Sequence, residues 1–409
     1  MALLLGASGL GGCSDVEAGR RPPLILITID AVRADHVSAY GYGRRTTPNL
    51  DALAERGMRY AYVLSPTPWS APAHAALLTG QDPDSLDFTS LDGEGLDPRT
   101  IMLPERLHAR GYDTWCVLAH DFVHPRWHLT QGVRHVDTAP IDVPSGPTRH
   151  AAVTDAALRA AGARGSRPFF LWVHYEGPRA PFEAPGDAVF EGDASYAGPV
   201  TSDVSLRGLL EIQASLDDDD RAEVARLYDE ELQRIDAELG RLLAGLTDAG
   251  LGDAVVAVTS PHGYALGERG HFGDAALLHD DLVRVPWVLA GPGVSHGVIQ
   301  DPVSLIDVAP TLFALADLVV HPDDPPMQGI VALPKYPAPA RPLFASTRRA
   351  VDLRAVVEGD LKLIRDNRTG HEDLFDVYAD PDESLEMSGS RAIEKDALSR
   401  RLDARFGPK

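Results

Sequence analysis

The sequence predicts an α/β protein with a large, mostly parallel sheet flanked by helices and a small antiparallel sheet at its C-terminal end. Residues 24–29 form a continuous apolar run rich in β-branched side chains, which is typical of a strand buried on both faces of a parallel sheet. Further strand-like runs alternate with helical patterns or Gly/Pro turns, as a helix-covered parallel sheet requires. These runs lie at residues 114–118, 169–173, 254–259 and 287–289.

The pattern changes after about residue 340, where short strand-like segments are joined by turns. The segments 355–358, 361–365 and 373–377 indicate a small antiparallel sheet. With 409 residues, of which 44% are hydrophobic, the chain is long enough to bury a large core. We therefore divide it into a leader and linker at 1–21, a main domain at 22–340 and a small subdomain packed on it at 341–409.

The first 13 residues are apolar and rich in small side chains, and they are too short to span a bilayer as a helix. They are typical of the end of an export signal. Residues 10–13 (LGGC) look like a bacterial lipoprotein cleavage box, in which Cys13 becomes a lipid-bearing N-terminus. We therefore predict an exported protein that is periplasmic or anchored to the membrane through Cys13. A flexible tail without a targeting role is the alternative, because no basic segment precedes the apolar run.

The formal net charge of −22 limits the classes of partner. A field of this sign repels polyanions, so we do not expect nucleic acid as a partner. Contact with a membrane is expected only through the lipid on Cys13. The field also opposes an anionic ester, so a site for one needs a divalent cation or convergent Arg and His. The only other cysteine, Cys116, is not at metal-ligand spacing from Cys13, which excludes a zinc–thiolate site and a disulfide framework.

Two polar residues stand at positions where the predicted fold places ligands. Asp30 ends the buried run 24–29, and ligand sites of open α/β sheets lie at the carboxyl ends of strands. An acid that caps the turn after the strand is the alternative for Asp30. Ser70 follows a Pro-rich loop and precedes the helix-forming run 74–78, where free N–H groups stabilise an anion.

Short motifs in a fixed order resemble the sulfatase family of the alkaline phosphatase superfamily. The resemblance covers the chain from about residue 22 to 390, and the order and spacing of the motifs make chance agreement improbable. The motifs lie at 29–36 (IDAVRADH), 40–42 (YGY), 47–51 (TPNLD), 75–80 (AALLTG), 111–112 (GY), 169–171 (FFL), 228–231 (YDEE), 284–286 (RVP), 307–311 (DVAPT) and 361–364 (LKLI).

The resemblance implies an oxygen nucleophile bound to a divalent cation, commonly calcium, that attacks a sulfate ester. Family members carry this nucleophile in C/S-x-P-S-R or x-P-S-H patterns, and residues 70–74 (SAPAH) align with them. Ser70 is therefore the candidate nucleophile, either as the plain hydroxyl or as the precursor of formylglycine, and both need activation. His74 and His262 are the other candidate catalytic residues.

The metal site implied by the resemblance is short of acids. Asp30 matches the first metal-binding acid, and His262 keeps the histidine of the S-D-H-G pattern, so these two are the candidate ligands. Ala31 and Pro261 stand where acids are usual. Because calcium takes six to eight oxygen ligands, we expect weak calcium binding unless a nearby acid, Asp274 or Glu268, compensates.

Two further residues are candidate substrate contacts. Arg179 replaces a histidine of the family pattern and can bind a sulfate bidentately, but it cannot act as a general acid at neutral pH. His271 matches a loop histidine that contacts the ester, with an ordinary core or surface histidine as the alternative. We discount His120, His124 and His128 as a metal cluster, because Pro125 breaks any helix that would align them.

Three functions fit these residues. The leading one is a sulfuric ester hydrolase that cleaves sulfate monoesters of a small molecule or a glycan with Ser70 as the nucleophile. The second is a catalytically impaired homologue that acts as a binding module, because two metal ligands are missing. The third is a phosphoester hydrolase or phosphotransferase of the same superfamily. The fold does not decide between them, because function depends on the site.

Overall fold

The computed structural model describes residues 21–88, 95–182, 190, 196–274, 277–320, 324–337, 339–348 and 351–407. The expectations about an export signal and a lipidated Cys13 concern residues that lie outside these ranges. Among the described residues, no helix has the length and apolar character needed to cross a membrane.

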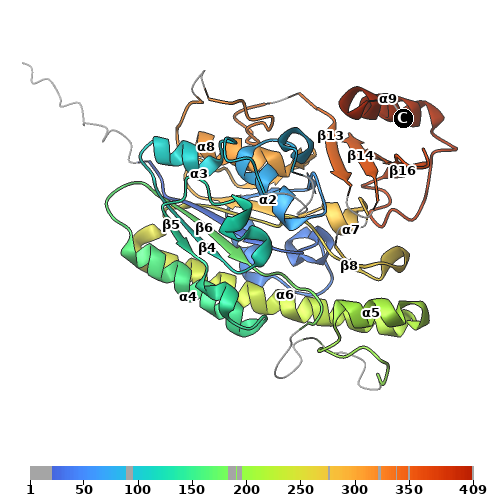
Figure 1. Ribbon diagram of the computed structural model, residues 1–409, viewed down its shortest axis with the longest axis horizontal. Helices are drawn as coiled ribbons and strands as arrows, with labels where there is room; N and C mark the ends of the chain where they lie inside the picture. Colours follow the sequence, from blue (N-terminus) through green and yellow to red (C-terminus); the bar gives the residue numbers. More distant parts are fainter. Residues whose placement is uncertain are drawn as a thin grey trace, which may run out of the picture.

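The centre of the molecule is a sheet of eight strands in the order β11-β2-β10-β7-β1-β6-β4-β5 (Figure 1). Only β10 runs antiparallel to its neighbours in this sheet, so the prediction of a mostly parallel sheet is confirmed. The strands are β1 (Leu24–Ile29), β2 (Met58–Tyr60), β4 (Asp113–Leu118), β5 (His135–Asp137), β6 (Phe169–Tyr175), β7 (Val255–Thr259), β10 (Trp287–Ala290) and β11 (Gly297–Ile299).

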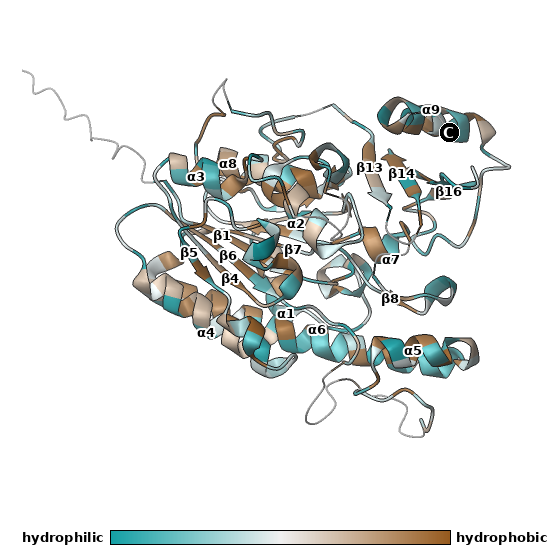
Figure 2. Ribbon diagram, viewed as in Figure 1, coloured by the Kyte–Doolittle hydropathy of each residue, from teal (hydrophilic) through white to brown (hydrophobic). Residues whose placement is uncertain are grey.

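Helices cover both faces of this sheet (Figure 1). On one face lie α1 (Pro48–Ala54), α4 (Pro147–Ala163) and α6 (Asp218–Leu246), and on the other lie α2 (Ser70–Thr79), α3 (Leu103–Ala109) and α8 (Val308–Leu315). Alternate residues of β1 enter the two cores, Ile25 and Ile27 on one side and Leu24 and Leu26 on the other. The central strands are therefore hydrophobic along most of their length (Figure 2).

The C-terminal part is a separate antiparallel sheet, as predicted. Its strands follow in chain order, β13 (Leu343–Thr347), β14 (Leu353–Glu358), β15 (Leu361–Asp366) and β16 (Glu372–Asp376). One face is covered by α9 (Ala392–Phe406), and the other packs against Tyr62, Leu64 and Leu282 of the main part. The division of the chain at residue 340 stays a prediction. Short elements complete the fold: β3 (Val63–Leu64), α5 (Leu206–Ile212), β8 (Ala265–Leu266), β9 (Phe272–Gly273), α7 (Asp280–Val283) and β12 (Val303–Ser304).

Candidate active site

Three neighbouring parallel strands carry the candidate site residues at their carboxyl ends. Asp30 follows β1, Arg179 follows β6 and His262 follows β7, and β1 lies between the other two strands. Gly177 allows the ends of β1 and β6 to approach, because a Cβ there would overlap the carbonyl oxygen of Asp30. Ser70 is the first residue of α2, which packs on the same sheet. Strand order therefore brings together residues that are far apart in the sequence.

The turn after β1 is fixed by hydrogen bonds from other segments. Ala31 has a φ of 59°, in the left-handed region that costs energy for a residue with a Cβ. The hydroxyl of Tyr228 donates to the carbonyl of Ala31 over 2.7 Å. The backbone N–H of Val32 donates to Ser260 Oγ over 3.0 Å, which ties the ends of β1 and β7 together. These contacts hold Asp30 in place.

The hydroxyl of Ser70 lies between a carboxylate and an imidazole. Ser70 Oγ is 2.8 Å from Asp30 Oδ2 and 2.9 Å from His262 Nε2. All three side chains are buried. His262 Nδ1 is 2.7 Å from the carbonyl oxygen of Gly263, which can only accept, so Nδ1 carries a proton. In the tautomer with the proton on Nδ1 alone, Nε2 carries a lone pair toward Ser70.

Arg179 supplies the positive charge of the site. Its Nη2 donates to Asp30 Oδ2 over 3.0 Å, and its Nη1 is 4.0 Å from Asp274 Oδ2. Burial alone would lower the pKa of Arg179, but Asp30 and Asp274 raise it, so the guanidinium stays charged. Burial alone would raise the pKa of Asp30, but the charge of Arg179 holds it well below its usual range. Asp30 is thus a weak base.

A buried pair of histidines lies behind Ser70. His74 Nδ1 is 2.7 Å from the carbonyl oxygen of Ser70, and its Nε2 is 3.3 Å from Thr28 Oγ1. His174 Nδ1 is 2.9 Å from the same hydroxyl, which also accepts a hydrogen bond from Trp172 Nε1. Burial lowers the pKa of His74 to about 4 and that of His174 well below its usual range. Both rings are therefore neutral at pH 7.

Asp30, His74 and His174 form a group that could hold a metal ion, because their ligand atoms all lie within 4.8 Å of one another. The sequence motifs indicate Asp30 and His74 but not His174. The available signal was a histidine inside the otherwise apolar strand β6, in register with Thr28 of β1. Only the register shows that these side chains meet beneath Ser70.

The side chains around Asp30 do not fit calcium. Calcium prefers six to eight oxygens, whereas Asp30 is surrounded by a hydroxyl, a guanidinium and imidazoles. Asp274, one of the two compensating acids considered above, lies nearby, with Oδ2 3.8 Å from His262 Nε2. Glu268, the other, forms an ion pair with Arg33 and accepts a hydrogen bond from the backbone N–H of Leu266. The single carboxylate of Asp274 does not replace two acids, which are missing because Ala31 and Pro261 occupy the positions where family members usually carry them.

The last predicted residue, His271, lies in the turn after the short helix Glu268–Gly270, where its backbone pairs with Gly267 and Glu268. No contact between its side chain and the group around Ser70 is found among the described residues. Its role as a substrate contact stays a prediction.

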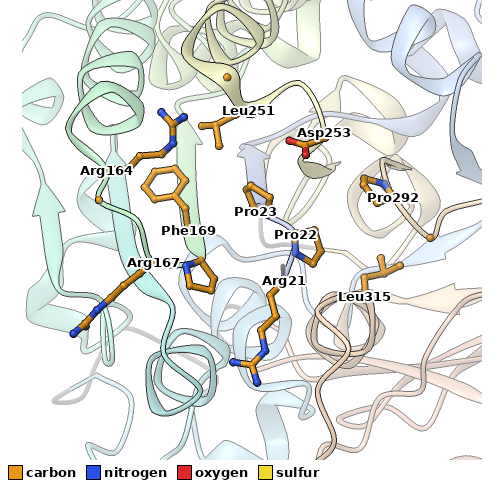
Figure 3. Close-up of a pocket in the computed structure, with 14 residues that line it drawn as sticks. Arg21, Pro22, Pro23, Arg164, Arg167, Phe169, Leu251, Asp253, Pro292 and Leu315 are labelled. Carbon is orange, nitrogen blue, oxygen red and sulfur yellow. The ribbon is translucent and has the colours of Figure 1, made fainter. Parts of the chain in front are cut away.

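A cavity of about 330 Å³ lies at the opposite edge of the sheet, where β1 and β6 begin (Figure 3). Arg21, Arg164 and Arg167 line it, but their guanidinium groups point in different directions (Figure 3). Arg164 is already used by the carbonyl oxygens of Ala161 and Ala249. The cavity therefore lacks the converging groups that Ser70 has.

Comparison with known proteins agrees with the fold. A sequence-family model described as Sulfatase matches residues 22–318. The uncharacterized sulfatase YidJ of Escherichia coli K12 is 24% identical over an alignment that covers 94% of this chain and 88% of YidJ. The structure of BT4656 with D-glucosamine-2-N,6-O-disulfate covers 94% of this chain and 97% of its own, with a TM-score of 0.74 and 20% identity. The structure of the phosphonate monoester hydrolase of Agrobacterium radiobacter aligns with 94% of this chain and 95% of the hydrolase chain, with a TM-score of 0.73 and 19% identity.

Proposed function

The chain belongs to the sulfatase family, and on that basis we propose that it hydrolyses sulfate monoesters with Ser70 as the nucleophile. The observation that supports this most is the position of Ser70 Oγ, 2.9 Å from the imidazole nitrogen of His262. A serine hydroxyl is a poor nucleophile at neutral pH unless a neighbouring base removes its proton. An imidazole is a stronger base than a carboxylate of depressed pKa, so His262 takes the proton rather than Asp30.

The proposed reaction has two steps that use protein groups. In the first, Ser70 Oγ attacks the sulfur, the S–O bond of the ester breaks, and the alcohol departs as its oxyanion with the electron pair of that bond and takes a proton from solvent. The single hydroxyl proton, which Ser70 donates to Asp30 Oδ2 in the resting site, turns toward His262 Nε2 and passes to it. In the second, water attacks the sulfur of the sulfated Ser70 and releases a proton to solvent, and the bond between the sulfur and Ser70 Oγ breaks. Sulfate is released, and Ser70 Oγ recovers its proton from His262 Nε2. Asp30 holds the serine hydroxyl and Arg179 through one carboxylate oxygen, so it is a positioning residue.

Arg179 is the proposed contact for the sulfate group. A chain with a net charge of −22 needs a fixed local cation to bind an anion, and the guanidinium supplies planar, bidentate donors. The organic part of the substrate is proposed to be a small molecule or a glycan. The sulfated glucosamine bound by BT4656 supports the glycan class.

Ser70 is proposed to act as a plain hydroxyl. Ala73 and His74 depart from the C/S-x-P-S-R pattern that precedes conversion to formylglycine. His74 also donates to the carbonyl of Ser70 and lies beneath the helix start. If the residue is converted, the resting peptide loses the mass of two hydrogens, which mass spectrometry of the purified protein detects.

Kinetics of variants test the proposal. The parent should hydrolyse a chromogenic aryl sulfate, and Ser70→Ala should lower kcat/KM by at least about 1000-fold, or about 4 kcal/mol. Thr79→Ala is the matched control, because it removes a buried hydroxyl at the far end of the same helix. That variant should keep its activity.

The alternatives give different results in the same assay. A phosphate or phosphonate ester cleaved faster than the sulfate would move the protein to the phosphoester class. No turnover of any of these esters by the folded parent would favour the non-catalytic binding module.

Two further expectations keep the status of proposals. We propose weak calcium binding, supported by the nitrogen-rich surroundings of Asp30. We also propose export, as a periplasmic protein or a lipoprotein anchored through Cys13, supported by residues 10–13 (LGGC). Metabolic labelling with a radioactive fatty acid tests the lipoprotein form, and Cys13→Ser should abolish the label.

A further inference from the structure

We propose that Asp30, His74 and His174 form a binding site for a transition-metal ion of the zinc class, beneath the helix start that carries Ser70. The ligand atoms of the three side chains lie within 4.8 Å of one another, and all three side chains are fully buried. The site shares Asp30 with the residues of the proposed hydrolysis, but it can be tested through metal binding alone.

Two buried atoms of this group lack hydrogen-bond partners among the described residues. They are Asp30 Oδ1 and His174 Nε2. A buried polar atom without a partner costs about 1–3 kcal/mol, and native proteins rarely leave such atoms unmet. Two of them in one cluster of three potential ligands indicate that a bound species belongs there. A metal ion or a buried water can satisfy them, and these two occupants predict different results below.

The hydrogen bonds of the two histidines leave lone pairs for a metal. His74 Nδ1 faces the carbonyl oxygen of Ser70, so it carries the proton and Nε2 carries the lone pair. Thr28 Oγ1 can accept from His174 Nδ1 over 2.9 Å, which leaves the lone pair of His174 on Nε2. The contact from Thr28 to His74 Nε2 is longer, 3.3 Å, so a metal can replace it at small cost.

The second ring of contacts is of the kind that orients metal ligands. In metal sites the non-ligating histidine nitrogen usually donates to a carbonyl or another oxygen. Here the carbonyl oxygen of Ser70 accepts the hydrogen bond from His74 Nδ1, and the hydroxyl oxygen of Thr28 can accept the one from His174 Nδ1. Arg179 and Ser70 occupy only Oδ2 of Asp30, so Oδ1 remains for the ion.

The donor set selects the class of metal. Two imidazoles and one carboxylate suit zinc, cobalt or nickel, whereas calcium and magnesium prefer oxygen ligands. Three protein ligands also leave a coordination position open on a zinc ion. The proposed ion therefore differs in class from the calcium that the family resemblance suggested.

Metal titration of the full chain, without a histidine tag and stripped with a chelator, tests the proposal. We expect one zinc ion per chain by calorimetry, a rise in Tm on zinc addition, and no displacement by millimolar calcium. Cobalt should give the intense visible bands of a four-coordinate site. His174→Asn should weaken zinc binding by more than about 100-fold, because loss of a residue that only hydrogen-bonds to a metal ligand already costs up to about that much.

His150→Asn is the matched control, since His150 is equally buried but lies in α4, away from the cluster. It should bind zinc like the parent. The proposal is overturned if the stripped parent neither binds zinc nor gains Tm, which favours the buried water, or if His174→Asn binds zinc as tightly as the parent. If His174→Asn does not fold, the stoichiometry and cobalt spectrum of the parent decide.

Discussion

Two buried aspartates, Asp30 and Asp229, have similar neighbours but differ in how their carboxylate oxygens are used. Asp30 and Asp229 both have an exposed fraction of 0%, and each lies beside a histidine and an arginine. Asp229 Oδ1 pairs with His36 Nδ1 at 2.7 Å, and its Oδ2 accepts from Tyr42 and Arg44, each at 2.7 Å. Both of its oxygens are used.

Asp30 differs in how its partners are distributed. Ser70 and Arg179 share one oxygen, while the other has no hydrogen-bond partner among the described residues. A carboxylate with both oxygens occupied stabilises the fold, whereas an incompletely satisfied one keeps capacity for a ligand or a reaction. The comparison therefore predicts that Asp30 matters mainly for activity and Asp229 mainly for stability.

The largest expected effect is on catalysis. Asp30→Asn should lower kcat/KM for an aryl sulfate by about 100–1000-fold, because the neutral amide no longer orients Arg179 and the serine hydroxyl. Its free energy of unfolding should change less than that of the Asp229 variant. An Asp30→Asn protein with full activity would contradict the prediction that Asp30 matters mainly for activity.

The next effect is on stability. Asp229→Asn should lower the free energy of unfolding by about 3 kcal/mol, since it removes the buried carboxylate that both His36 and Arg44 contact. Urea unfolding measures this loss. The folded fraction should retain the kcat of the parent, and a variant that is stable but inactive would contradict the assignment.

The smallest effect concerns pH. The folded protein holds the pKa of His74 at about 4, whereas an imidazole in the unfolded chain titrates near 6.5. The unfolded state takes up its proton first as pH falls, so stability from this group is full above about pH 6.5 and is lost toward pH 4. When the pH is lowered from 7 to 5, the free energy of unfolding of the parent should fall by on the order of 2 kcal/mol more than that of His74→Gln.

Urea unfolding at both pH values, with a chelator present, makes this comparison. An identical loss of stability in the parent and in His74→Gln would mean that His74 is not held neutral by burial.

The sequence predicted the parts of the site that depend on position along the chain. Asp30 ends an apolar strand and Ser70 precedes a helix, so local patterns were sufficient to select them. The helix-covered sheet followed from the alternation of elements for the same reason. The reversed direction of β10 was not predicted, because strand direction depends on the path of the connecting chain.

The missed features depend on contacts between distant segments. Thr28 and His174 become neighbours through the pairing of β1 with β6, and α2 then brings His74 against them. His174 is the one histidine of an otherwise apolar strand, but its position in the sequence does not show that it faces Thr28. The ion pair between Arg179 and Asp30 was likewise invisible, since the sequence indicated an anion contact but not its partner.

Mass spectrometry of the peptide that contains Ser70, after acid quenching of a reaction with an aryl sulfate, tests the central claim most directly. The account predicts an added sulfo group on Ser70 that is absent from unreacted protein and from the Ser70→Ala variant. Turnover that proceeds with the sulfo group on another residue, or that continues at the parent rate in Ser70→Ala, would contradict the account.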